Sequence, residues 1–191
     1  MDNARVDLLV GQLDMVWALF EHHAGAIDDE ACLWEPAPGA WSVRPGVDGR
    51  WVADWEVPGP EPVPVTTVGW LTWHIGYWWT TTLGHCFGDG APAREDIAWP
   101  GDAGAAVRWI GALKEEWRTA LLGLADGELD STERTRGLPW GEGLPLSAVA
   151  AWLNFELAKN VAEIGSVLHL RGALAAGGGR PTPRGGPAGG A

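Results

Sequence analysis

The chain has 191 residues, which is enough for one domain with a substantial hydrophobic core and short for two domains. Hydrophobic residues make up 46% of the sequence and charged residues 20%, a composition that is typical of globular proteins and excludes a disordered chain. The formal net charge of -12 disfavours contact with phosphate backbones and anionic lipids, so we expect neither a nucleic-acid partner nor a membrane partner.

The cysteines and the first residues of the chain indicate a cytoplasmic protein. Cys32 and Cys86 are too few for a disulfide framework, and no CxxC pair is present. The segment from Met1 to Arg5 is polar and lacks the layout of a signal peptide. The longest apolar stretch, residues 68 to 79, is too short to span a bilayer. We therefore expect a cytoplasmic location with both thiols reduced.

The first predicted element is a helix over residues 4 to 24, where apolar residues recur at spacings of three and four. The acidic residues at positions 28 to 30 are placed like an N-cap and the first turn of a short helix. Seven prolines forbid a regular helix between residues 34 and 65, so a long loop is predicted there. This loop also contains four tryptophans, which indicates that it packs against the domain.

Three further helices are predicted, over residues 66 to 88, 103 to 124 and 147 to 172. A glycine-rich and charged loop separates the last two, and no strand pattern is visible. The predicted fold class is therefore all-α: a four-helix bundle over residues 1 to 172, with long loops after the first and the third helix. Residues 173 to 191 are mainly Ala, Gly and Pro and are predicted to form a disordered tail.

Polar residues interrupt the apolar face of the last predicted helix. At 100° per residue, Glu156, Asn160 and Glu163 share one narrow sector with the valines and the leucine that define this face. Burying an unpaired carboxylate costs several kcal/mol, so a cation, hydrogen-bond donors or protonation must compensate. Since Glu156 and Asn160 are four residues apart, their side chains are expected to point at the same place.

His74 lies on the apolar side of the predicted helix over residues 66 to 88 and is the natural counterpart of these groups. Helical bundles commonly form metal and cofactor sites from inward side chains of facing helices. We therefore expect His74 and Glu156 to act as a catalytic pair, and His74, Glu156 and Asn160 to hold a metal weakly. The alternative is a buried histidine that is hydrogen-bonded to these polar groups without any metal.

Tryptophan is unusually abundant, with 14 Trp against three Phe and one Tyr. Core filling and the anchoring of loops account for most of these side chains. The other interpretation is that some of them line a pocket for a flat or apolar ligand. The predicted ligand-binding residues are Asn160, Glu163, Trp70, Trp73, Trp78 and Trp152.

Three segments carry a resemblance to known proteins: WEPAPGAWSVRP over residues 34 to 45, TTVGWLTWHIGYW over 66 to 78, and WLNFELAKNVAEIGSVLHLRG over 152 to 172. In this order they resemble the actinobacterial branch of the DinB-like family, which is related to mycothiol-dependent maleylpyruvate isomerases and bacillithiol S-transferases. The resemblance extends over roughly residues 5 to 172. It implies a four-helix bundle that is often a homodimer and that holds a divalent metal, such as Zn or Ni, near one end.

The resemblance also implies where the metal ligands lie. The family takes one histidine from the second helix and a pair of ligands from the fourth, where this branch typically reads R-E-V-I-H-H-G-A-E-I. Matched residue by residue, the first ligand is His74 and the second is Glu156. The third position holds Asn160 in place of histidine, and the neighbouring histidine position holds Lys159. Replacing an imidazole by an amide removes a strong ligand, so the implied metal site is degenerate.

Three functions are compatible with these observations. The resemblance implies a small-molecule enzyme, leaning towards a transferase that uses a low-molecular-weight thiol and a weak or absent divalent metal, with His74 and Glu156 positioning or deprotonating a nucleophile. The alternative is a metal-free enzyme or binding protein for an apolar or aromatic metabolite in a tryptophan-lined pocket. The third is a non-catalytic bundle whose buried polar residues fix the helix register.

Overall fold

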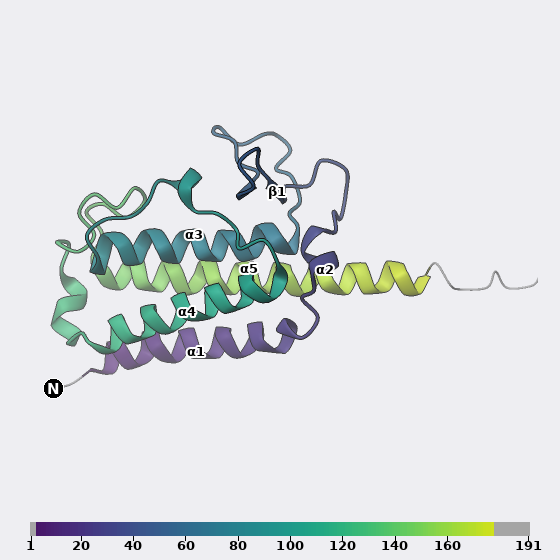
Figure 1. Cartoon of the computed structure of the whole chain (residues 1–191). Coiled ribbons are helices and arrows are strands. Elements are labelled where there is room, and N and C mark those ends of the chain that lie inside the picture. The colour runs from purple at the N-terminus through teal and green to yellow at the C-terminus, as the bar shows by residue number, and fades with distance from the viewer. Residues whose placement is uncertain (1–2, 178–191) are drawn as a thin grey trace, which may run out of the picture.

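The structure is a computed structural model that describes residues 3 to 177, and four long helices dominate it (Figure 1). These helices are α1 (Ala4–Ala24), α3 (Val68–Phe87), α4 (Ala103–Leu122) and α5 (Leu146–Gly177). Both α1 and α3 pack against α4 and α5, so the four helices enclose one hydrophobic core. Among the described residues, no helix is long and apolar enough to cross a membrane. The predicted all-α class is confirmed apart from two short strands.

The starts of α3 and α4, which were predicted at residues 66 and 103, are fixed by N-cap residues. The Thr67 hydroxyl accepts a hydrogen bond from the backbone N–H of Trp70 at 3.2 Å. The Asp102 carboxylate accepts one from the backbone N–H of Ala105 at 2.7 Å. Such bonds satisfy N–H groups that have no partner within the helix, so they determine where each helix begins.

The proline-rich segment after α1 contains more regular structure than predicted. It holds the short helix α2 (Asp29–Leu33) and an antiparallel hairpin of β1 (Val43–Pro45) and β2 (Trp51–Ala53). The prediction that this region contains no strand was wrong, because strands of three residues are too short to produce a recognisable alternation. The backbone N–H of Trp41 donates to the carbonyl of Val65 at 2.9 Å, which holds the two ends of the segment together beside α3.

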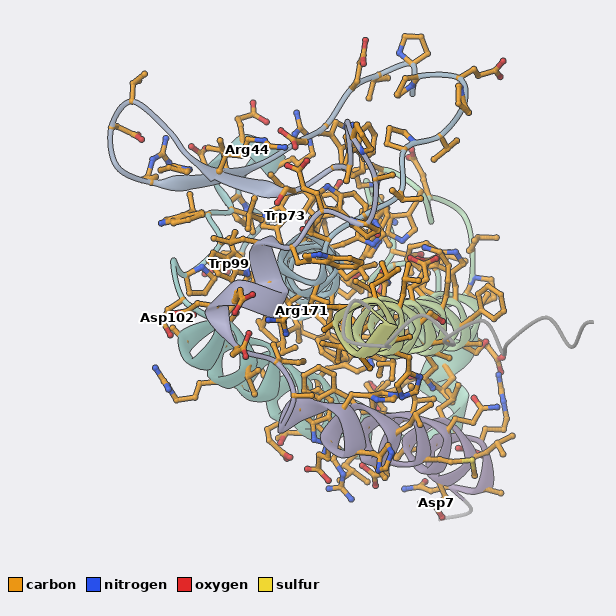
Figure 2. The ribbon with its side chains drawn as sticks, turned by 90° about the vertical axis from the view of Figure 1, so that its right-hand side faces the viewer. Asp7, Arg44, Trp73, Trp99, Asp102 and Arg171 are labelled. Atoms are coloured by element: carbon orange, nitrogen blue, oxygen red, sulfur yellow. The ribbon has the colours of Figure 1, made fainter. Side chains whose placement is uncertain are left out.

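The remaining connections are short or contain 3-10 turns. They include η1 (Arg94–Asp96) between α3 and α4, and η2 (Asp126–Asp130) between α4 and α5. The backbone carbonyl of Ile97, just after η1, accepts a hydrogen bond from Trp73 in α3 at 2.7 Å. Figure 2 shows Trp73 between the segment that carries Arg44 and the helices beneath it.

The last helix is longer than the sequence indicated. It was predicted to end near Gly172, but α5 continues to Gly177. A glycine within a helix costs only about 1 kcal/mol, which a long helix that is anchored elsewhere tolerates. Arg171 in α5 pairs with Glu30 at 3.1 Å and so ties this end of the helix to α2 (Figure 2). The rest of the predicted tail, residues 178 to 191, lies outside the described residues.

The close packing of α3 on α4 depends on Gly76. This glycine is buried, and a Cβ atom added to it would overlap the indole ring of Trp109 in α4. The missing side chain therefore makes room for a ring that partly covers the core.

Substitution of two helical glycines tests this packing. Gly76→Ala should lower the free energy of unfolding by about 1–3 kcal/mol, because the methyl group forces the Trp109 ring to move. Gly11→Ala in α1, where no atom lies within 4 Å of the added carbon, should raise it by about 0.5–1 kcal/mol through helix propensity. Urea unfolding measures both values, and equal stabilities of the two variants would contradict the proposed contact.

Candidate functional site

His74 is buried in α3, with 6% of its surface exposed, and it is hydrogen-bonded through both ring nitrogens. Its Nδ1 lies 3.0 Å from the Oδ1 of Asn160 in α5. Its Nε2 lies 2.8 Å from the Nε1 of Trp78, one turn further along α3. The side-chain nitrogen of Asn160 donates to the backbone carbonyl of Glu156 at 2.7 Å. We call His74, Trp78 and Asn160 the His74 network, and it links α3 to α5.

The partners of His74 determine its tautomer. A backbone carbonyl can only accept, so the amide nitrogen of Asn160 must face Glu156 and its oxygen must face His74. An indole N–H can only donate, so the Nε2 of His74 accepts from Trp78 and its proton resides on Nδ1. Burial lowers the pKa of His74 to about 4; the hydrogen bond to Asn160 opposes this shift and the charge of Lys159 adds to it. A protonated ring would also carry an N–H on Nε2, and this donor would face the N–H of Trp78.

This donor set does not fit a divalent metal. One nitrogen of His74 carries a proton and the other accepts the N–H of Trp78, while Asn160 offers only an amide, a poor ligand for zinc. The Glu156 carboxylate pairs with the ammonium of Lys159 at 3.2 Å. The hollow beside Trp78, Glu156 and Asn160 measures about 10 Å³, enough for one water at most. Between residues 3 and 177, no group of three His, Cys, Asp or Glu side chains is arranged to hold a metal ion.

The predicted residues His74, Glu156 and Asn160 lie close together, but their side chains have different hydrogen-bond partners. His74 bonds to Asn160 and Trp78, whereas the Glu156 carboxylate bonds to Lys159. No hydrogen bond joins His74 directly to Glu156 within the described part of the chain. The catalytic pairing of these two residues is consequently not part of the function that we propose below.

Two of the predicted tryptophans contribute to packing. Trp73 is buried, with 1% of its surface exposed, and its ring stacks on Tyr77 at 5.5 Å. Trp152 in α5 meets Trp78 edge-on at 4.8 Å, and Trp140 from the preceding loop packs against both rings. This aromatic cluster closes the interior beside the His74 network on the side of the loop between α4 and α5.

An open groove of about 420 Å³ lies between the proline-rich segment, the start of α3 and the second half of α5. We call it the tryptophan groove. Its walls are mainly apolar, and the side chains that form them include Pro36, Trp41, Pro64, Trp70, Val167 and Leu170. Two charged side chains from α5, Lys159 and Glu163, also line it. Of the predicted ligand-binding residues, Trp70 and Glu163 lie in this groove.

Stacked rings connect the tryptophan groove to the His74 network. The Trp70 ring lies on the His74 ring with a centroid separation of 4.5 Å and an interplanar angle of 22°. Trp41 packs against Trp70 at 5.6 Å, and Trp55 stacks on both of them at 6.1 and 6.4 Å. The indole N–H of Trp70 donates to the backbone carbonyl of Asp54 at 2.8 Å. The aromatic wall is thus fixed by both α3 and the proline-rich segment.

Glu163 is the acidic group of the groove that has no direct partner. Its side chain is half-buried, and it forms no hydrogen bond or ion pair with the residues that the structure describes. Burial raises the pKa of Glu163; the positive charge of Lys159 opposes this shift and the negative charge of Glu156 adds to it. Lys159 itself is paired with Glu156.

Trp41 and Lys159 line the tryptophan groove but are not among the ligand-binding residues predicted from the sequence. Trp41 belongs to a loop, and loop residues carry no periodicity that shows which helix they will face. The position of Lys159 could have been inferred from the sequence, because it precedes Glu163 by four residues and residues at this spacing share one face of a helix.

Lowering the pH should decrease the free energy of unfolding, because the fold keeps His74 neutral. Because its pKa falls from 6.5 to about 4 on folding, the unfolded chain takes up a proton that the folded chain excludes between these values. His74 therefore contributes its full share to the free energy of unfolding above the pKa of the unfolded state. This share falls as the pH drops, by about 2 kcal/mol between pH 7 and pH 5.

Urea unfolding at these two pH values measures this contribution. His74→Gln should lose this part of the pH dependence, whereas His22→Gln, at an exposed position in α1, should keep it. The same pH dependence in both variants would show that His74 is not held neutral by the fold.

Comparison with known proteins gives a family for this architecture. The search of curated proteins and the search of solved structures returned no match. The family model of the DinB superfamily matches residues 50 to 164, more than half of the chain. The matched region begins just before β2, ends within α5 and contains the whole His74 network. The chain therefore belongs to the DinB superfamily.

Proposed function

We propose that this protein is a metal-independent, four-helix-bundle member of the superfamily that binds a small, largely apolar and aromatic molecule in the tryptophan groove. The observation that carries the proposal is the contrast between two spaces. The groove offers about 420 Å³ beside two indole rings, whereas the hollow next to the His74 network offers about 10 Å³. Small-molecule sites typically occupy roughly 300–1,000 Å³ and combine apolar walls with a few polar groups, which describes the groove.

The His74 network supports this role by positioning the aromatic wall. His74 stacks directly behind Trp70, and its bond to Asn160 joins the helix of one wall to the helix of the other. A ligand that lies against a fixed ring loses less free energy to the ordering of the site than one that must first align it. His74 and Asn160 are therefore positioning residues in this proposal, and Trp41 and Trp70 are the residues that touch the ligand.

The two cysteines favour a binding role in which neither thiol of the protein reacts with the ligand. Burial raises the pKa of Cys32 to about 12 and that of Cys86 to about 11. Both side chains are buried and neither lines the groove. Because the thiolate is the nucleophilic form of cysteine, neither residue is suited to attack a bound molecule.

A second hollow on the surface serves as a comparison. It measures about 570 Å³ and lies between α4 and the segment that follows α3, beside Trp109 and Arg108. It is larger than the tryptophan groove but has a single aromatic side chain in its lining. We assign the ligand to the tryptophan groove because two indole rings, Trp41 and Trp70, line it, whereas one lines the second hollow.

Filling the groove should weaken the binding of a ligand. Val167→Trp places an indole inside the tryptophan groove and should weaken the binding of a neutral aromatic probe, naphthylethanol, at least about tenfold, since the probe loses its place beside Trp41 and Trp70. Ala105→Trp makes the matched change in the second hollow and should leave the affinity unchanged. Isothermal titration calorimetry measures both. Equal affinities in the two variants, or no binding of the probe to the wild-type protein, would contradict the proposal.

A further inference from the structure

We propose that the ligand of the tryptophan groove is an organic cation, an ammonium compound with an apolar or aromatic body whose charge pairs with Glu163. This inference rests on the proposed function and adds the chemical class of the ligand. It follows from the distribution of charges along α5, from the chemistry of the groove walls and from the burial of one acidic side chain.

The charges that line or border the groove do not balance. Glu156, Lys159 and Glu163 follow one another along α5, so two carboxylates share one ammonium group. The ammonium of Lys159 lies 3.2 Å from the carboxylate of Glu156 and is not within ion-pair distance of Glu163. The lining of the groove contains no other charged side chain among the described residues. One negative charge is therefore left without a direct partner at the groove.

Glu163 is half-buried against an apolar wall, an environment that penalises an unpaired carboxylate. The raised pKa of Glu163, caused mainly by burial, reports the same penalty. An ammonium group at this position would restore the charge-assisted hydrogen bonds that the carboxylate lacks. An anionic ligand would instead bring a third negative charge beside Glu156 and Glu163, with only Lys159 to offset it.

The aromatic walls favour the same class of ligand. The face of an indole attracts a cation through its ring quadrupole, and tryptophan is the strongest of the aromatic residues in this respect. Trp41 and Trp70 both line the groove that contains Glu163. The neighbouring Trp55 already carries a cation on its ring, the guanidinium of Arg94 at 5.2 Å from the centroid. The net charge of -12 also attracts a cationic ligand to the protein.

Three probes with one ring system and different charges test the inference. Naphthylethylamine is cationic at neutral pH, naphthylethanol is neutral and naphthylacetate is anionic. Isothermal titration calorimetry with the full chain should show that the amine binds about tenfold or more tightly than the alcohol, and that the acid binds most weakly. Glu163→Gln should remove the preference, so that the ratio of the amine affinity to the alcohol affinity falls to about one. Glu116→Gln, the same change at an exposed position in α4, should keep the preference.

A second variant gives an independent measurement. Lys159→Gln removes the positive charge nearest to Glu163 and should increase the preference for the amine further. Equal binding of amine and alcohol to the wild-type protein, tightest binding of the acid, or an unchanged preference in Glu163→Gln would overturn the inference. The proposed function would survive these results, because the neutral alcohol would still bind in the groove. If none of the three probes bound, both the inference and the proposed function would be refuted.

Discussion

Two hydrogen bonds to one buried imidazole link the interior of this domain to its surface groove. Asn160 accepts from one nitrogen of His74 and Trp78 donates to the other, so the ring is neutral and both of its polar atoms are satisfied. The first bond joins α3 to α5, and the ring itself supports Trp70 from behind. The same arrangement that stabilises the interior thus also fixes the wall of the surface groove.

The hydrogen bonds of His74 do not suit the metal site that the family resemblance implies. An imidazole can coordinate a metal only through a nitrogen lone pair, and in His74 the one lone pair is directed at an indole N–H. Asn160 donates to the backbone carbonyl of Glu156, and the Glu156 carboxylate pairs with Lys159. Membership of a superfamily does not by itself fix a function, and the function that we propose for this chain uses the tryptophan groove rather than the interior of the bundle.

The sequence predicted the parts of the structure that depend on periodicity and local chemistry. The four long helices and the meeting of His74 with Asn160 follow from residue spacing. The groove did not, because one of its walls is a proline-rich segment whose position depends on tertiary contacts such as the packing of Trp41 against Trp70 in α3. The sequence also could not show which acid pairs with Lys159, since spacing alone allows Lys159 to pair with either Glu156 or Glu163.

The most direct test of this account is the protonation state of one ring. Nitrogen-15 NMR of the imidazole of His74 at neutral pH, recorded with and without added zinc, reports which nitrogen carries the proton and whether either binds a metal. We expect a neutral ring with its proton on Nδ1 and resonances that zinc does not change. A proton on Nε2, a charged ring, or a zinc-dependent shift that is lost in Glu156→Gln would contradict it.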